Sequence, residues 1–148
     1  ICANRNRDAY AALGYPVIGD LLADFQGPLA GLQAGLVACA TPWLVTCPCD
    51  CPTLPPDLVM RLLQAAEAHQ AKTAVASTRE GMQPIFQLCH RDMLPELNAF
   101  LASGKRRVGS WCRETLAVEA MFSDPAMFAN LNTPAELSAN LPNAAASG

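Results

Sequence analysis

The sequence has no apolar run long enough to cross a membrane, because proline, glycine or polar residues break every such run before about 18 positions. It also shows no basic-then-apolar leader with a cleavage site. Charged residues make up only 16% of the chain, and the net charge of −3 argues against nucleic acid as a partner. We therefore expect a soluble, cytoplasmic protein that binds neither nucleic acid nor a membrane.

Histidine is equally scarce. His69 and His90 are the only two in the chain, and neither lies in a recognisable motif. Catalysis by a Ser-His-Asp or Cys-His constellation is therefore not indicated. This scarcity favours metal-assisted group transfer, which depends more on positioning than on a side-chain base.

Cysteine is present seven times, an odd number without any sign of secretion, so a disulfide framework is not expected. Cys47, Cys49 and Cys51 alternate and suggest a metal cluster. Zinc ligands, however, are usually separated by two to four residues and joined by a distant second pair. We interpret these three as small, buried, reduced cysteines.

Half of the residues are apolar, 51%, which suits one α/β domain over residues 1–142 with a frayed tail over 143–148. Apolar runs and helical periodicity alternate along the chain. The expected strands are Tyr15–Ile18, Trp43–Cys47, Thr73–Ser77, Pro84–Leu88 and Ala117–Phe122, and the expected helices are Asp8–Leu13, Pro28–Ala40, Pro55–Gln70, Asp92–Ser103, Ser110–Arg113 and one that starts at the Thr133–Glu136 capping box. This order predicts a three-layer, Rossmann-like, mostly parallel sheet with helices on both faces. The strands from Pro84 and Ala117 are expected to form a small antiparallel extension.

Two aspartates follow predicted strands, where ligands bind in folds of this kind. Asp50 comes directly after Trp43–Cys47, which we expect to be the most buried strand and a central one. It lies between Pro48 and Pro52, and a carboxylate there can hold Mg²⁺ or merely cap the next turn. Asp20 can accept hydrogen bonds from a base or ribose, or simply end its strand.

The helix after Gln26 begins with Gly27-Pro28, and its free N–H groups could receive an anion. Gly27, Gly31 and Gly35 recur every four residues and share one helix face. Glycine within a helix costs about 1 kcal/mol relative to alanine, so this stripe predicts close approach of a strand or a ligand.

Basic and amide side chains near the carboxyl end form two further candidate groups. Lys105, Arg106 and Arg107 are the only dense basic run, which is either a solvated helix end or a phosphate-binding loop. Asn130 and Asn132 share a face if their segment is extended, where they can bind substrate, although Asn132 can equally form a turn.

Together these segments resemble the molybdenum cofactor guanylyltransferase family, often called MobA. The matching pieces are Cys2-Ala3-Asn4-Arg5, Asp20, Gly27-Pro28-Leu29-Ala30-Gly31, Cys47-Pro48-Cys49-Asp50, Arg106-Arg107-Val108 and Asn130-Leu131-Asn132-Thr133-Pro134. They occur in the family's order and cover nearly the whole chain. The resemblance implies transfer of GMP from GTP to molybdenum-bound molybdopterin, with loss of pyrophosphate and with Mg²⁺ as the cofactor.

The resemblance also implies roles for particular residues. Asp50 would be the catalytic magnesium ligand, and Cys2, Asp20, Gly27 and Gly31 would lie around the guanine nucleotide. Relatives often have asparagine where this chain has Cys2. Arg106, Arg107, Asn130 and Asn132 would lie on the side of the pterin phosphate. Other cofactor-biosynthesis proteins and recipient molybdoenzymes are the implied protein partners.

The family begins with a strand and a glycine-rich loop, whose arginine and lysine cradle the triphosphate. No such segment precedes Ile1 in the printed sequence. We expect either further residues before Ile1 in the molecule or a true truncation. A true truncation should lose GTP turnover and leave a central strand exposed.

Two other functions stay open. One is a cytidylyltransferase for the same pterin, or another small-molecule nucleotidyltransferase, although the Gly27–Gly31 segment favours guanine. The other is a non-catalytic module that binds the pterin through Arg106, Arg107 and the two asparagines.

Overall fold

The computed structural model describes residues 1–21 and 27–131. Its elements are α1 (Arg7–Ala11), α2 (Pro28–Ala38), β1 (Trp43–Thr46), α3 (Leu58–Ala68), β2 (Thr73–Thr78), β3 (Gly81–His90), the 3-10 helix η1 (Arg91–Met93), α4 (Leu94–Ala102), α5 (Val108–Glu114), β4 (Val118–Met121) and the 3-10 helix η2 (Pro125–Phe128). The capping box at Thr133, Asn132 and the tail over 143–148 lie outside the described residues. Within the described ranges, no helix has both the length and the apolar character needed to cross a bilayer.

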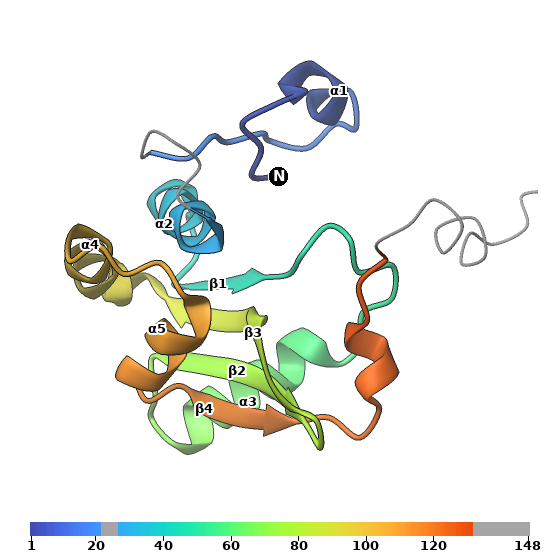
Figure 1. The fold of residues 1–148 in the computed structure, drawn as a ribbon, viewed down its shortest axis with the longest axis vertical. Helices are drawn as coiled ribbons and strands as arrows, with labels where there is room; N and C mark the ends of the chain where they lie inside the picture. The colour runs from blue at the N-terminus through green and yellow to red at the C-terminus, as the bar shows by residue number, and fades with distance from the viewer. Residues whose placement is uncertain (22–26, 132–148) are drawn as a thin grey trace, which may run out of the picture.

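The four strands form one sheet in the order β1-β3-β2-β4, seen from top to bottom in Figure 1. β3 pairs antiparallel with both β1 and β2, whereas β2 and β4 pair parallel. Three of the four strands therefore point in one direction, as the sequence predicts for a mostly parallel sheet. Their carboxyl ends meet at one edge of the sheet.

The sequence predicted that the strands from Pro84 and Ala117 form a small antiparallel extension. This prediction was wrong about the position of the first strand and the direction of the second. β3 is a ten-residue strand in the interior of the sheet, and β4 is parallel to its neighbour. Between Val75 and Ala76 of β2 the register shifts, so that their partners on β3 are Gln87 and Gln83. This bulge accommodates Pro84, which has no N–H to donate to a neighbouring strand. Because proline usually begins or interrupts a strand, the sequence predicted a strand that starts at Pro84, shorter than β3 is.

Helices cover both faces of the sheet, as predicted, because alternate side chains of a strand point to opposite faces. Val75 and Cys89 face α2, α4 and α5, where Leu32 and Trp111 are almost fully buried. The other face packs on α3 and η2, with the cluster Leu58, Leu62, Ala66, Ala74, Ala76, Phe86, Leu88, Ala120, Phe122 and Phe128 at its centre. Figure 1 shows α5 in front of the strands and α3 behind them.

The N-terminal segment lies beyond α2, away from the sheet (Figure 1). Its predicted strand Tyr15–Ile18 reduces to one parallel bridge between Cys2 and Ile18. Two backbone hydrogen bonds close this bridge, from Ala3 N to Ile18 O at 2.8 Å and from Ile18 N to Ile1 O at 2.9 Å. The bridge places residues 2 and 20 side by side, next to the start of α2.

Candidate active site

A cleft of about 660 Å³ opens between the N-terminal segment, the start of α2 and the carboxyl end of β1. Five of the residues that the sequence singled out line it together: Cys2, Asp20, Gly27, Gly31 and Asp50. The carboxyl end of β1 is thus one wall of the cleft, as expected for this class of fold. The prediction that this strand is the most buried one was wrong, because in the sheet of the described residues β1 is the half-buried edge strand, whereas β2 is buried along its whole length.

Asp50 is exposed in the turn that follows β1. In residues 1–21 and 27–131, no hydrogen bond or ion pair engages its carboxylate, so the structure does not support the capping role. Its backbone oxygen accepts a hydrogen bond from Leu131 N at 2.7 Å. This bond joins the turn after β1 to the segment after η2 and presents the carboxylate to the cleft.

Asp20 is held by two side chains from the opposite strand of the N-terminal bridge. Asn4 Nδ2 donates to Asp20 Oδ2 at 2.8 Å, and Asp20 N donates to Asn4 Oδ1 at 2.9 Å. The Cys2 thiol lies 3.5 Å from Asp20 Oδ1. Desolvation raises the pKa of Cys2, and the hydrogen bond and negative charge of Asp20 raise it further, so the thiol stays a donor at neutral pH.

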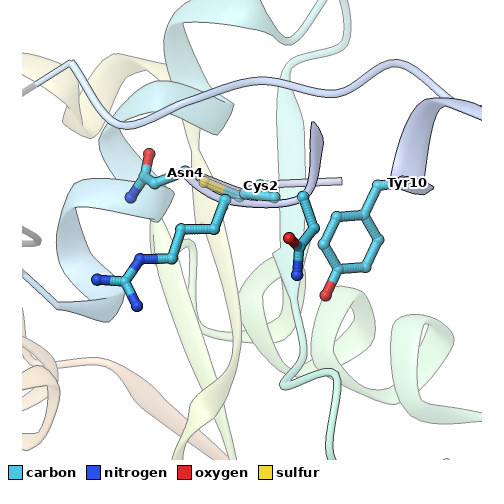
Figure 2. Close-up of a pocket in the computed structure, with 6 residues that line it drawn as sticks. Cys2, Asn4 and Tyr10 are labelled. Atoms are coloured by element: carbon cyan, nitrogen blue, oxygen red, sulfur yellow. The ribbon is translucent and has the colours of Figure 1, made fainter. Parts of the chain in front are cut away.

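A second, shallower hollow lies beside the cleft and shares the Cys2–Asn4 segment with it. Figure 2 shows Cys2 and Asn4 on this segment and Tyr10 beside them on α1. The N-terminal segment therefore separates two hollows, and Asp20 belongs to the larger one.

The glycines of α2 are explained by two close approaches. A Cβ at Gly31 would lie 3.2 Å from Cys2 Sγ, and one at Gly35 would lie 2.7 Å from Leu44 Cδ2. Gly27 has a φ of 81°, in the left-handed region that favours glycine, and it precedes the first turn of α2. Gly35 thus lets α2 approach β1, whereas Gly31 makes room for Cys2 at the cleft.

The interpretation of buried alternating cysteines was wrong for two of the three residues. Cys47 and Cys49 are exposed and line the cleft, whereas Cys51 is buried and its thiol donates to Thr53 O at 3.1 Å. The strand ends at Thr46, so the alternation does not continue on one face. Within the described residues, no cluster of three or more His, Cys, Asp or Glu side chains is arranged to hold a metal.

The basic run Lys105–Arg107 does not line the cleft, and Lys105 and Arg106 form hydrogen bonds with groups close to them in the sequence. Lys105 Nζ lies 2.9 Å from both Glu114 carboxylate oxygens, and Arg106 Nη1 donates to Leu101 O at 2.6 Å and to Lys105 O at 2.7 Å. Arg107 is exposed directly before α5. These contacts agree with the helix-end interpretation of the run.

Asn130 lines a hollow that adjoins the main cleft. Pro48 and Ile85 line both spaces, so the two are neighbours across these side chains. Asn132, its expected partner, lies outside the described residues. The structure therefore brings Asn130 near the Asp50 end of the cleft, but it does not bring Arg106 or Arg107 into the lining.

Three residues of the site were not selected from the sequence. Asn4 lies in the Cys2–Arg5 motif, and membership of this motif was the sequence feature that could have identified it as a site residue. Thr46 and Gln87 also line the cleft, from β1 and β3. A polar residue inside the apolar run Ile85–Cys89 was the only sign of Gln87.

A family model described as the MobA-like NTP transferase domain matches residues 1–118. The chain therefore belongs to this family of nucleotidyltransferases. A protein of Cupriavidus taiwanensis named molybdenum cofactor guanylyltransferase is 48% identical over 145 residues, covering 95% of this chain and 73% of the relative. One of Bordetella pertussis with the same name is 46% identical over 141 residues, covering 93% and 72%.

Solved structures show the same fold at low sequence identity. A protein of Aquifex aeolicus superposes with a TM-score of 0.75 at 19% identity, over 90% of this chain and 70% of that one. Molybdopterin-guanine dinucleotide biosynthesis protein A of Archaeoglobus fulgidus gives 0.67 at 17% identity, over 94% and 74%.

Proposed function

We propose that this protein transfers GMP from GTP to the terminal phosphate of molybdenum-bound molybdopterin and releases pyrophosphate, forming the molybdopterin guanine dinucleotide cofactor. The names of the curated relatives support this reaction at 48% and 46% identity. The observation that carries the proposal is the exposed Asp50 carboxylate in one cleft with Asp20 and the start of α2.

Asp50 is the proposed metal ligand and catalytic residue. Its carboxylate has no protein partner among the described residues, and Asp20, the other acidic side chain in the described lining of the cleft, is held by Asn4. Mg²⁺ fits such a site, because it binds through one or two carboxylates and completes its shell with phosphate oxygens and water. When bound, Mg²⁺ would neutralise charge on the triphosphate.

The nucleotide side of the cleft is proposed to consist of Cys2, Asp20, Gly27 and Gly31. Asp20 accepts hydrogen bonds from the base or ribose, and Asn4 holds its carboxylate in place. Gly27 gives the nucleotide access to the start of α2, whose free N–H groups favour an anion, and Gly31 makes room for Cys2 beside it.

The pterin side is proposed to include Asn130 and Asn132, with Arg106 and Arg107 contacting its phosphate. The hollow of Asn130 supports this arrangement, since it shares Pro48 and Ile85 with the cleft. An oxygen of the pterin phosphate attacks the α-phosphorus of GTP, and the bond from that phosphorus to the oxygen of the leaving pyrophosphate breaks. The residues of the cleft contribute mainly by orienting the two phosphates.

The test is a pyrophosphate-release assay with GTP, CTP and molybdenum-loaded molybdopterin. The protein is expressed with whatever coding sequence flanks the chain in its gene. We expect turnover with GTP and little competition by CTP. Preferential use of CTP would replace the proposal with a cytidylyltransferase, and pterin binding by calorimetry without any GTP binding would replace it with a pterin-binding module.

A further inference from the structure

Gln87 is a wall residue of the cleft although its side chain is almost completely enclosed, with 3% of its surface exposed. It lies on β3 directly opposite Thr46 of β1. Leu44 and Cys89, the next pair on this face, pack against the core beneath α2, so Gln87 and Thr46 point to the same side of the sheet.

The carboxamide of Gln87 is only half engaged. Its oxygen accepts a long contact from Cys112 Sγ of α5 at 4.0 Å. In the part of the chain that the structure describes, Nε2 donates to no acceptor. Two side-chain polar atoms in that part are fully enclosed and lack a partner, Gln33 Oε1 and Trp111 Nε1. Gln87 Nε2 is not one of them, so it keeps some accessible surface, and the space that Gln87 lines is the cleft.

The Cys112 thiol approaches this amide on its oxygen side, through the long contact of 4.0 Å. Burial raises the pKa of the Cys112 thiol to about 11, so at neutral pH the sulfur keeps its proton and acts as a donor. A protonated thiol is compatible with the amide oxygen as its neighbour. The two N–H groups of Gln87 have no acceptor among the described residues, and Gln87 lines the cleft.

A purely structural role does not account for this side chain. Its neighbours on the same face of the sheet, Val75 and Cys89, belong to an apolar core and are 0% exposed. A buried amide is unfavourable there unless its donors find acceptors. Protein groups among the described residues do not supply them, but an occupant of the cleft would.

We infer that Gln87 donates a hydrogen bond to an oxygen of the base or the ribose of the bound nucleotide, as a further substrate-contacting residue. This inference rests on the proposed function. The pterin-side residues Arg106, Arg107 and Asn130 do not line the cleft, whereas the nucleotide-side residues do. A neutral amide suits a carbonyl or hydroxyl oxygen, and the phosphates are assigned to the Asp50 end.

The test compares Gln87→Met, which keeps length but has no donor, with the parent protein. We expect the KM for GTP to rise about three- to tenfold with kcat nearly unchanged, the effect of losing one neutral hydrogen bond made in both ground and transition states. Calorimetry with GTP should show the same loss of affinity. Gln87→Asn, which keeps the amide but shortens its reach, should behave similarly and decides the case if the methionine variant does not fold.

Gln33→Met is the matched control. Gln33 is also buried, at 8% exposure, but its Nε2 donates to Asn98 Oδ1 at 2.6 Å, and it does not line the cleft. Its variant should lower Tm and leave the KM unchanged. Repeating the Gln87→Met assay with 2′-deoxy- and 3′-deoxy-GTP locates the acceptor oxygen. If the acceptor is a ribose hydroxyl, the substitution does not change the KM for the analogue that lacks this hydroxyl. If the substitution raises the KM for both analogues, the acceptor lies on the base.

Two negative results are distinguishable. Parent-like KM and GTP affinity in both Gln87 variants would overturn the Gln87 contact alone. A parent protein that neither binds nor turns over GTP would overturn this inference together with the proposed function.

Discussion

The side chain of Asn4 holds Asp20 from two directions, since it donates to the carboxylate at 2.8 Å and accepts from the backbone N–H at 2.9 Å. Both residues lie at the mouth of the cleft, on the two arms of the N-terminal bridge. The carboxylate is therefore preorganised before any ligand binds, which lowers the entropy lost on binding.

We predict that Asn4→Ala raises the KM for GTP about three- to tenfold and leaves kcat within twofold, because Asp20 loses its support while the reacting phosphates are untouched. Asn4→Asp should be worse, since it places a second carboxylate against Asp20. Steady-state kinetics with GTP measures both.

Asn6→Gly is the control for Asn4, because it lies on the same loop and its φ of 52° suits glycine. It should keep the parental KM. Equal KM increases in Asn4→Ala and Asn6→Gly would show a general loosening of the loop and contradict the specific role of Asn4.

Asp50→Ala is predicted to lower GMP-transfer turnover by at least about 10²-fold, the usual cost of removing a key electrostatic stabiliser. Stability should change little, because the carboxylate is exposed and unpaired within the described residues. Single-turnover pyrophosphate release, with thermal unfolding as a companion measurement, tests this.

Asp57→Asn provides a matched aspartate outside the cleft. Its carboxylate lies 3.6 Å from Arg61 Nη1 at the start of α3, an exposed pair of little energetic weight. Its turnover should be close to that of the parent. Near-normal transfer by Asp50→Ala would remove the central residue of the proposed mechanism.

Gly31→Ala is predicted to weaken GTP binding by displacing Cys2, since the new Cβ would lie 3.2 Å from Cys2 Sγ. Its effect on unfolding free energy should be small, because the gain of about 1 kcal/mol in helix propensity offsets crowding. Calorimetric affinities for Gly31→Ala, Cys2→Ala and the double variant form a cycle. Cys2→Ala should rescue much of the loss, and additive effects would instead indicate direct contact between Gly31 and the ligand.

Stability is predicted to fall as pH rises above 9. Burial raises the pKa of Cys89 to about 12 and that of Cys112 to about 11, from the ordinary thiol value of 9.0. Above pH 9 the unfolded chain loses these protons while the folded protein keeps them, so the unfolded state is favoured. The stabilisation is complete below the unfolded pKa and lost as pH rises toward the folded values.

The expected loss is about 1 kcal/mol per thiol between pH 9 and pH 10. Urea unfolding at pH 8, 9 and 10, under reducing conditions, measures it. The Cys89→Ser/Cys112→Ser variant should lose less stability over the same interval, because serine does not titrate there. Parallel pH profiles for the two proteins would contradict the prediction.

Much of the fold was predictable because its signals are local. Pro28 and the spacing of Leu29, Leu32 and Leu36 predicted α2, and the short apolar run from Trp43 predicted β1. Asp50 was placed at a strand's carboxyl end by the same logic. The place of β3 was not predictable, since which strands pair depends on contacts between residues far apart in sequence.

The candidate site divides in the same way. Asp20, Gly27 and Asp50 were selected at the ends of predicted elements, Gly31 came from the glycine stripe, and Cys2 came from the family resemblance. The structure brings all five into one cleft. Cys47 and Cys49 were misjudged, because the exposure of a residue after a strand depends on how the chain leaves the sheet. Asn4 and Gln87 acquire their significance only from partners 16 and 25 residues away.

The sequence by itself determined where most of the strands and helices form and which polar residues follow strands, since periodicity, proline and glycine act within a few residues. The tertiary structure alone decided that residues 2, 20, 50 and 87 share one space. It also decided that the loop after β1 is tied to the segment after η2 by the bond from Leu131 N to Asp50 O. Such relationships depend on strand pairing and on the packing of α2 against the sheet, which join parts of the chain that no local pattern connects.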